Sequence, residues 1–133
     1  MVAADLSERI PLALSLDDVL LVPQYSDVNI DDIDVSTNLT KRLKLRIPIV
    51  SSPMDTVTGR EMTLRLAELG GLGTLPRNMD LHEAVAVVEE AKGRKLPVAA
   101  AVGPFDDQRV KSLVDAGASL IVVDSAHGHS RNV

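Results

Sequence analysis

Residues 98–124 read VAAAVGPFDDQRVKSLVDAGASLIVVD, and this stretch decides the fold. It holds two short apolar runs, 98–102 and 120–123, with polar residues at their ends and not at alternate positions. Such runs are typical of strands buried on both faces, as in parallel sheets covered by helices. Between them, 106–116 has a helical apolar period and stops at Gly117. The stretch therefore predicts a strand, a helix and a second, parallel strand.

The same pattern continues toward the N-terminus. Two further apolar runs, 47–50 and 72–75, predict two earlier strands. Pro48 removes one hydrogen-bond donor from the first of them and so weakens its ladder. The chain is thus predicted to repeat a strand-then-helix step, with four strands and right-handed crossovers.

Two earlier helices are predicted from capping-box patterns. Thr58 followed by Glu61 predicts the start of a helix over 60–69, and Asp80 followed by Glu83 predicts the start of the next one. Apolar residues then recur at helical spacing after each start, so each helix is expected to bury one face.

The expected fold class is α/β, and the residues alone leave two architectures open, of which the first is a TIM (β/α)₈ barrel with this chain supplying about the first four βα units. A closed barrel of this kind needs about 250 residues. Residues 46–133 would form the first half of the barrel, and the irregular residues 1–45 an arm that packs on it. A half-barrel exposes sheet edges, so we expect a fragment or a chain that pairs with a partner. An open doubly wound sheet is the alternative.

Composition excludes several classes of function. The 133 residues are 45% hydrophobic and 25% charged, as in one globular domain, and the net charge of −5 disfavours nucleic acid and anionic membranes. The chain has no cysteine, which removes disulfides, thiolate metal sites and thiol nucleophiles. No signal peptide and no membrane span is predicted, so a cytoplasmic location is expected.

Candidate functional residues follow the apolar runs, because ligands bind beyond the carboxyl ends of strands in both folds. These segments are 51–56, 76–79, 103–106 and 124–129. Hydroxyl, amide and carboxylate groups are thereby expected at one edge of the sheet.

Each candidate also has a structural interpretation. Ser51 and Ser52 would satisfy backbone groups at a strand end, and Asp124 would cap a following helix or pair with a base. Phe105 would form a hydrophobic staple at a helix start or stack on a planar ligand. Met54 would fill a gap in the core.

Two further classes of site are not expected. His127 and His129 are two residues apart with no third ligand nearby, so a metal site is not predicted. No Gly-x-Gly-x-x-Gly or P-loop pattern follows a strand, which disfavours a Rossmann nucleotide site.

Five blocks of sequence, in the same order, resemble the inosine-5′-monophosphate (IMP) dehydrogenase family. They are Leu16–Pro23, Ile47–Thr58, Gly70–Gly73 with Asn78–Met79, Ala99–Gly103 and Val123–Ser130. GMP reductase, which shares the barrel, is the close alternative. The resemblance covers nearly the whole chain and implies a (β/α)₈ barrel.

The resemblance implies oxidation of IMP to XMP with NAD, usually by a homotetramer. In that family a cysteine in the second half of the barrel attacks the purine, and a monovalent-cation (K⁺) site lies outside the segment matched here. No residue of this chain is therefore expected to be catalytic, and the chain alone is expected to be inactive. Its partners would be IMP, NAD and the remaining half of the barrel.

Residue by residue, the resemblance implies two sets of contacts. Ser52 is similar to a serine that holds the IMP phosphate, Met54 to a methionine under the purine, and Asn78 to a residue that lines the pocket. Asp124 and Ser125 resemble the pair at the nicotinamide ribose, Gly103 a residue that lines the pocket, and Phe105 one that stacks on the adenine.

The chain departs from the family at three places. Pro76-Arg77 replaces the usual His-Lys, Gly59 replaces a common Glu, and residues 92–97 connect directly where most members insert a pair of CBS domains. Control by nucleotides through CBS domains is therefore not expected. A half-barrel that binds nucleotide or a partner chain without turnover remains the non-enzyme alternative.

Overall fold

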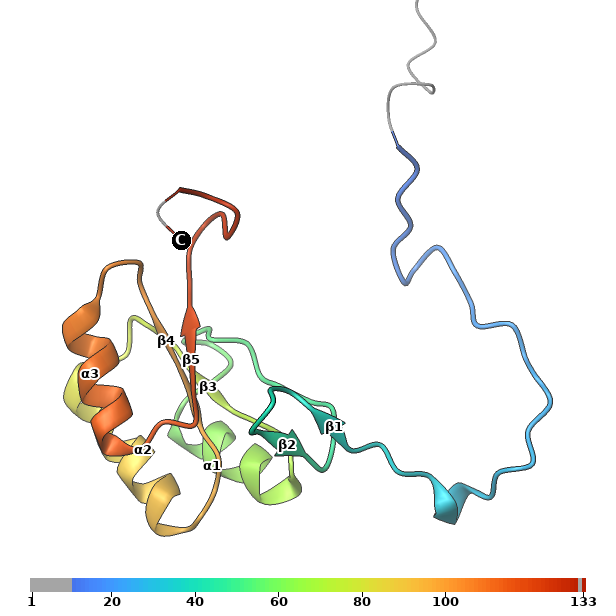
Figure 1. Cartoon of the computed structure of the whole chain (residues 1–133), viewed down its shortest axis with the longest axis horizontal. Helices are drawn as coiled ribbons and strands as arrows, with labels where there is room; N and C mark the ends of the chain where they lie inside the picture. The colour runs from blue at the N-terminus through green and yellow to red at the C-terminus, as the bar shows by residue number, and fades with distance from the viewer. Residues whose placement is uncertain (1–10, 132) are drawn as a thin grey trace, which may run out of the picture. The chain divides into compact units, whose positions relative to one another are not determined.

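The computed structural model describes residues 11–131 and Val133, and its internal contacts divide the chain after Ile33 (Figure 1). In the first unit, a 3-10 helix, η2, spans Ile30–Asp32, and the Asp18 carboxylate accepts a hydrogen bond from the Ser15 N–H at 2.9 Å. The contacts place residues 34–45 with the second unit. Packing of the predicted 1–45 arm on a barrel stays a prediction.

The second unit is a mixed α/β fold, which confirms the predicted class. Its elements are β1(Thr37–Asn38), β2(Lys44–Leu45), α1(Arg60–Leu69), β3(Thr74–Leu75), α2(Leu81–Gly93), β4(Ala99–Val102), α3(Asp107–Ala116) and β5(Leu120–Val123). β1 and β2 form an antiparallel hairpin. The main sheet has the order β3-β4-β5 and is parallel throughout, so its crossovers are made by helices.

The first predicted strand, 47–50, is much shorter in the structure. Val50 forms a single parallel bridge with Leu72, supported by two backbone hydrogen bonds of 3.0 Å around it. Toward the N-terminus the Ile49 N–H donates to the Ile47 carbonyl at 2.9 Å, in a tight turn around Pro48, and the Gly70 carbonyl accepts from Arg46 and Ile47, so the ladder does not extend further.

The helix starts follow the sequence signals in two of three cases. Asp80 accepts hydrogen bonds from two N–H groups of α2, and Asp106 accepts one from the Arg109 N–H of α3. The predicted capping box at Thr58 is wrong, because Gly59 is the N-cap of α1 and provides no side-chain cap. The Thr58 hydroxyl instead donates to the Ser52 carbonyl at 2.6 Å, which ties the preceding loop together.

The core lies between the sheet and its three helices. Leu64 of α1, Val88 of α2 and Leu113 of α3 pack in one cluster with Ala100 and Val102 of β4. All three helices therefore lie on one face of the sheet, and Figure 1 shows α2 and α3 side by side there.

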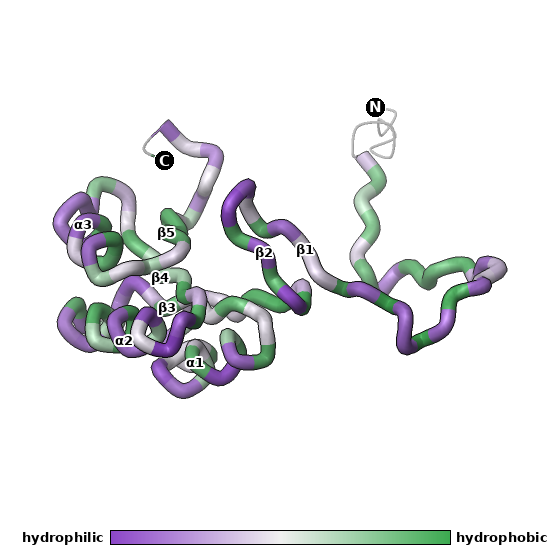
Figure 2. The backbone as a smooth tube through the Cα atoms, turned by 60° about the horizontal axis from the view of Figure 1, so that its bottom comes forward, coloured by the Kyte–Doolittle hydropathy of each residue, from purple (hydrophilic) through white to green (hydrophobic). Residues whose placement is uncertain are grey.

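The opposite face of the sheet packs against the hairpin. Leu45 of β2 is buried with Leu72 and Ala99. Every residue of β4 is buried, as the continuous apolar run predicted, whereas β5 is half-buried to exposed. Figure 2 shows β4 and β5 as hydrophobic segments, while each helix alternates between hydrophilic and hydrophobic residues.

Candidate functional site

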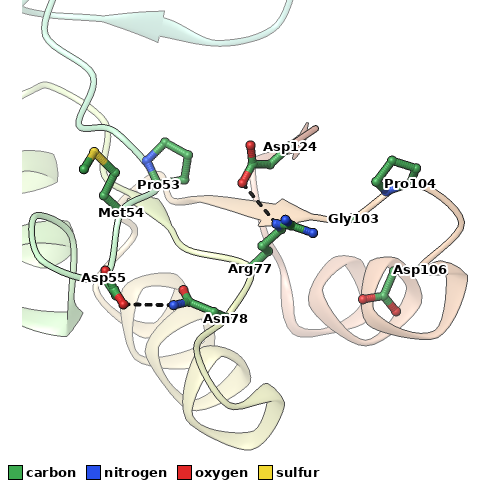
Figure 3. A pocket seen from close by; sticks show the side chains of 9 residues that line it. All are labelled: Pro53, Met54, Asp55, Arg77, Asn78, Gly103, Pro104, Asp106 and Asp124. Carbon is green, nitrogen blue, oxygen red and sulfur yellow. Dashed lines mark hydrogen bonds and ion pairs between the residues drawn. The ribbon is translucent and has the colours of Figure 1, made fainter. Parts of the chain in front are cut away.

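A cavity of about 550 Å³ lies at the carboxyl ends of the parallel strands (Figure 3). Its walls come from the loop after Val50 and from the residues that follow β3, β4 and β5. The lining residues are Pro53, Met54, Asp55, Arg77, Asn78, Gly103, Pro104, Asp106 and Asp124. Its size and position are those of small-molecule sites in α/β proteins.

Two polar pairs cross this cavity (Figure 3). Arg77 Nε lies 3.3 Å from Asp124 Oδ2, and Asn78 Nδ2 donates to Asp55 Oδ2 at 3.0 Å. Adjacent residues after β3 therefore reach in two directions, one toward the end of β5 and the other toward the loop after Val50. Each pair therefore links two segments that are far apart in the sequence.

Four of the residues singled out from the sequence meet in this cavity, namely Met54, Asn78, Gly103 and Asp124. Met54 is 54% exposed, so it does not fill a gap in the core of this chain. The Asp124 backbone N–H donates to the Val102 carbonyl at 2.8 Å, which continues the β4–β5 ladder to the edge of the cavity. Asp124 begins no helix in the described part of the chain and is paired with a base.

The other three predicted residues lie beside the cavity and do not line it. Ser52 is exposed and precedes Pro53, and Ser125 follows Asp124 and accepts a weak hydrogen bond from the His127 N–H at 3.4 Å. Phe105 is 80% exposed and has a φ of +65°. Such exposure contradicts the hydrophobic staple, which requires the ring to be packed on the helix. Stacking of Phe105 on a ligand stays a prediction.

Ser51 and Ser52 have different environments. Ser51 Oγ accepts a hydrogen bond from the Thr74 N–H at 3.2 Å and is hydrogen-bonded to the Thr58 hydroxyl at 2.9 Å. The structural interpretation of Ser51 is therefore confirmed. The Ser52 carbonyl accepts from Thr58, and its exposed side chain leaves the hydroxyl accessible to solvent.

Arg77, Asp55 and Asp106 line the cavity but were not assigned a role from the sequence. The sequence marks Arg77 only as a departure from the family pattern, because its contact with Asp124 depends on the order of the strands in the sheet. Asp106 was expected to belong to a helix start, and it caps α3 from the cavity wall. The available signal was that each residue lies in the segment that follows a predicted strand.

The His127 and His129 rings are 6.4 Å apart and meet edge to face. Within the described residues, no group of three or more His, Asp or Glu side chains is placed to hold a metal ion. In the same part of the chain, the helices are too short or too polar to cross a bilayer.

Comparison with known proteins identifies the family of this chain. The family model described as "IMP dehydrogenase / GMP reductase domain" matches residues 13–133. An inosine-5′-monophosphate dehydrogenase from Cryptosporidium parvum is 34% identical over 170 residues, which cover 96% of this chain and 42% of that protein. The enzyme of the same name from Aquifex aeolicus is 44% identical over 84% of this chain and 23% of its own length. That from Methanocaldococcus jannaschii is 56% identical over 60% of this chain and 16% of its own length.

The chain spans less than half the length of these curated relatives. The family match extends from the first described unit through all three parallel strands to the last residue. It therefore includes every segment that lines the cavity. This chain belongs to the IMP dehydrogenase / GMP reductase family.

Proposed function

We propose that this chain forms part of the nucleotide site of an enzyme that oxidises IMP to XMP with NAD. The single observation that carries this proposal is the cavity at the strand ends. It brings together Met54, Asn78, Gly103 and Asp124, which come from four separate loops and which match nucleotide-contacting positions in the family resemblance.

The proposed architecture is a (β/α)₈ barrel to which this chain contributes about four βα units. Burial of α1, α2 and α3 against one face of the sheet supports the barrel over a doubly wound sheet, which carries helices on both faces. The half-exposed β5 would pair with the next strand of the barrel. The remaining half of the barrel is thus the first proposed partner, and a homotetramer in the cytoplasm is the proposed assembly.

Asp124 fits the ribose of NAD. A carboxylate accepts two charge-assisted hydrogen bonds, and a ribose diol offers two donors close together. Asp124 is 38% exposed at the cavity wall, so its carboxylate is accessible to a ligand. When bound, NAD supplies the acceptor of a hydride, while Asp124 and Ser125 would hold the ribose and Phe105 and Gly103 would lie along the rest of the dinucleotide.

IMP would lie toward the loop after Val50. Ser52 has an exposed side chain and would donate a hydrogen bond to the phosphate, and Met54 would lie under the purine. Asn78 Nδ2 donates to Oδ2 of Asp55, which lies in the loop after Val50, at 3.0 Å. This hydrogen bond would help to keep that loop in its binding conformation. The chain's own residues would thus bind and orient both nucleotides.

The reactive groups would come from the remaining half of the barrel. Covalent attack on the purine requires an activated nucleophile, and this chain contains no cysteine. The potassium site of the family is placed outside this chain as well. The 133-residue chain alone is therefore expected to bind nucleotide weakly and to turn nothing over.

The test is an assay of the complete enzyme, meaning this chain joined to the rest of the barrel. We expect IMP-dependent formation of NADH, measured by its absorbance, and no such formation by the 133-residue chain alone. NADPH-dependent conversion of GMP to IMP in place of this activity would show a GMP reductase. Absence of both reactions in a folded, complete enzyme would contradict the proposal.

A further inference from the structure

Arg77 and Asp124 come from strands that are not neighbours in the sheet. The strand order is β3-β4-β5, and Arg77 follows β3 whereas Asp124 follows β5. The Arg77 side chain therefore reaches across the end of β4 to place its Nε 3.3 Å from Asp124 Oδ2 (Figure 3).

Gly103 stands at the end of β4, where the arginine crosses. A Cβ atom added at Gly103 would lie 3.5 Å from Arg77 Nη1, which is ordinary van der Waals contact. The guanidinium thus lies directly over this glycine, and a longer side chain at position 103 would occupy the space that the arginine uses. The ends of three strands together define the position of the pair.

The ion pair restrains the side-chain rotamer of Asp124, which the backbone hydrogen bond does not. The Asp124 N–H is held by the Val102 carbonyl at 2.8 Å, but its χ1 angle has three staggered alternatives. Among the described residues, Arg77 is the ion-pair partner of Asp124. Pairing through Oδ2 selects one orientation and leaves Oδ1 and the second lone pair of Oδ2 to accept the two donors of a ribose diol.

The same pair contributes little to folding. The two side chains are 55% and 38% exposed, and ion pairs of this exposure contribute about 0–1 kcal/mol to stability because water screens them. Asp124 lies at the cavity wall, so the ion pair can still affect the binding of a ligand there. Its removal would weaken ligand binding and change the free energy of unfolding by no more than about 1 kcal/mol.

We propose that Arg77 is a positioning residue that holds the Asp124 carboxylate in the orientation in which it accepts the ribose diol of the dinucleotide. This inference rests on the proposed function, since it needs Asp124 to contact that ribose. A carboxylate already oriented for its ligand loses less conformational freedom on binding. If Asp124 is free to occupy other rotamers, apparent affinity falls in proportion to the time spent in them.

The experiment measures equilibrium binding of NAD and of IMP to the complete enzyme by titration calorimetry. The variants are Arg77→Gln, Asp124→Asn, the double variant, and Arg77→Lys as the conservative control. We expect Arg77→Gln to weaken NAD binding by about threefold, because one of three χ1 wells is then no longer selected. IMP binding should change by less than about twofold, and the melting temperature by no more than about 4 °C.

The double variant identifies the route by which Arg77 acts. If Arg77 acts through Asp124, Arg77→Gln has almost no effect once Asp124 is already Asn, because the two substitutions remove one interaction. Arg77→Lys, which keeps the charge, should recover part of the NAD affinity.

Four results would overturn the proposal. An equal loss of NAD affinity in the wild-type and Asp124→Asn backgrounds would show that Arg77 contacts the ligand directly. Unchanged NAD binding with a lowered melting temperature would show a purely structural pair. If the wild-type enzyme bound no NAD, the proposed function would fail and this inference with it, whereas intact wild-type binding with an unaffected Arg77→Gln variant would refute the inference alone.

Discussion

Ser51 and Ser52 are adjacent, but their hydroxyl groups face different surroundings. Ser51 is hydrogen-bonded to Thr58 and to the Thr74 N–H, and so joins the loop to β3. Ser52 is exposed beside the cavity. The pair therefore allows a structural role and a binding role to be compared at neighbouring positions.

Ser52→Ala in the complete enzyme should raise the KM for IMP about 10- to 100-fold, because one hydrogen bond to a charged phosphate is lost. Its melting temperature should stay unchanged, since the Ser52 side chain is exposed. Steady-state kinetics and thermal unfolding check the two parts. The reverse outcome, a normal KM with reduced stability, would assign Ser52 to the fold.

Ser51→Ala is the matched control. It leaves the Thr74 N–H without its acceptor, and an unsatisfied buried donor costs about 1–3 kcal/mol of stability. Denaturant unfolding should therefore show a clear loss for Ser51→Ala and none for Ser52→Ala. Equal losses would mean that both serines serve the fold.

At the residue scale, the sequence predicts positions better than contacts. Asp124 and Asn78 could be placed at the carboxyl edge because each follows a strand. The ion pair between Arg77 and Asp124 could not be predicted, because it depends on β4 lying between the two strands. Whether the Ser51 or the Ser52 side chain is the exposed one depends on the conformation of the loop, which the sequence alone leaves open.

Among the elements, β3 and α1 approach each other at Gly73. A Cβ atom at this position would lie 2.4 Å from the Thr63 Cα, which is backbone and has no rotamer by which to move away. The glycine is therefore required for the helix to pack on the strand.

Gly73→Ala should destabilise the fold by about 1–3 kcal/mol, the usual cost of overpacking a core. Gly93→Ala is the control, because Gly93 ends α2 and its added Cβ would meet nothing within 4 Å. Alanine there should be neutral or stabilise by up to about 1 kcal/mol. Urea unfolding measures both variants, and similar stabilities for the two would contradict the close approach at Gly73.

The start of α2 has a predictable pH dependence. Hydrogen bonds from the Glu83 and His82 N–H groups lower the pKa of Asp80 below its ordinary value. A lowered pKa in the folded state means that this stabilisation is present above the ordinary aspartate pKa of about 3.9 and is lost as the pH falls below it.

Asp80→Asn should keep the cap but lose this dependence, since asparagine caps a helix about as well as aspartate and does not titrate. Unfolding experiments at neutral pH and near pH 3 should show a smaller acid-induced loss of stability for the variant than for the wild-type chain. Parallel pH profiles for the two proteins would rule out the ionised cap.

The elements were predictable where one local signal acted alone. The Asp80 cap, the glycine stop at Gly117 and the buried run of β4 all appear as expected. The predictions that fail are those in which a contact with another part of the chain competes with the local signal. Thr58 matches a capping pattern, but its hydroxyl is used by the loop before α1. The strand at 47–50 is reduced to one bridge, because the Gly70 carbonyl accepts from Arg46 and Ile47 and not from Ile49.

At the scale of the whole fold, the parallel sheet creates the site. Three helices on one face and the hairpin on the other hold β3, β4 and β5 in register, so their carboxyl ends meet at one cavity. The buried β4 is the fixed centre, and Arg77 and Asp124 meet across its end. The central claim is that this edge of the sheet binds the dinucleotide.

Asp124→Asn tests this claim most directly, because it keeps the size of the side chain while removing its charge and one acceptor. NAD and IMP should be titrated separately into the complete wild-type enzyme and the variant. NAD binding should weaken by about 10- to 100-fold, the loss expected for hydrogen bonds to a charged group, while IMP binding stays within about twofold. Unchanged affinities for both nucleotides would contradict the claim that Asp124 and this edge of the sheet hold the cofactor.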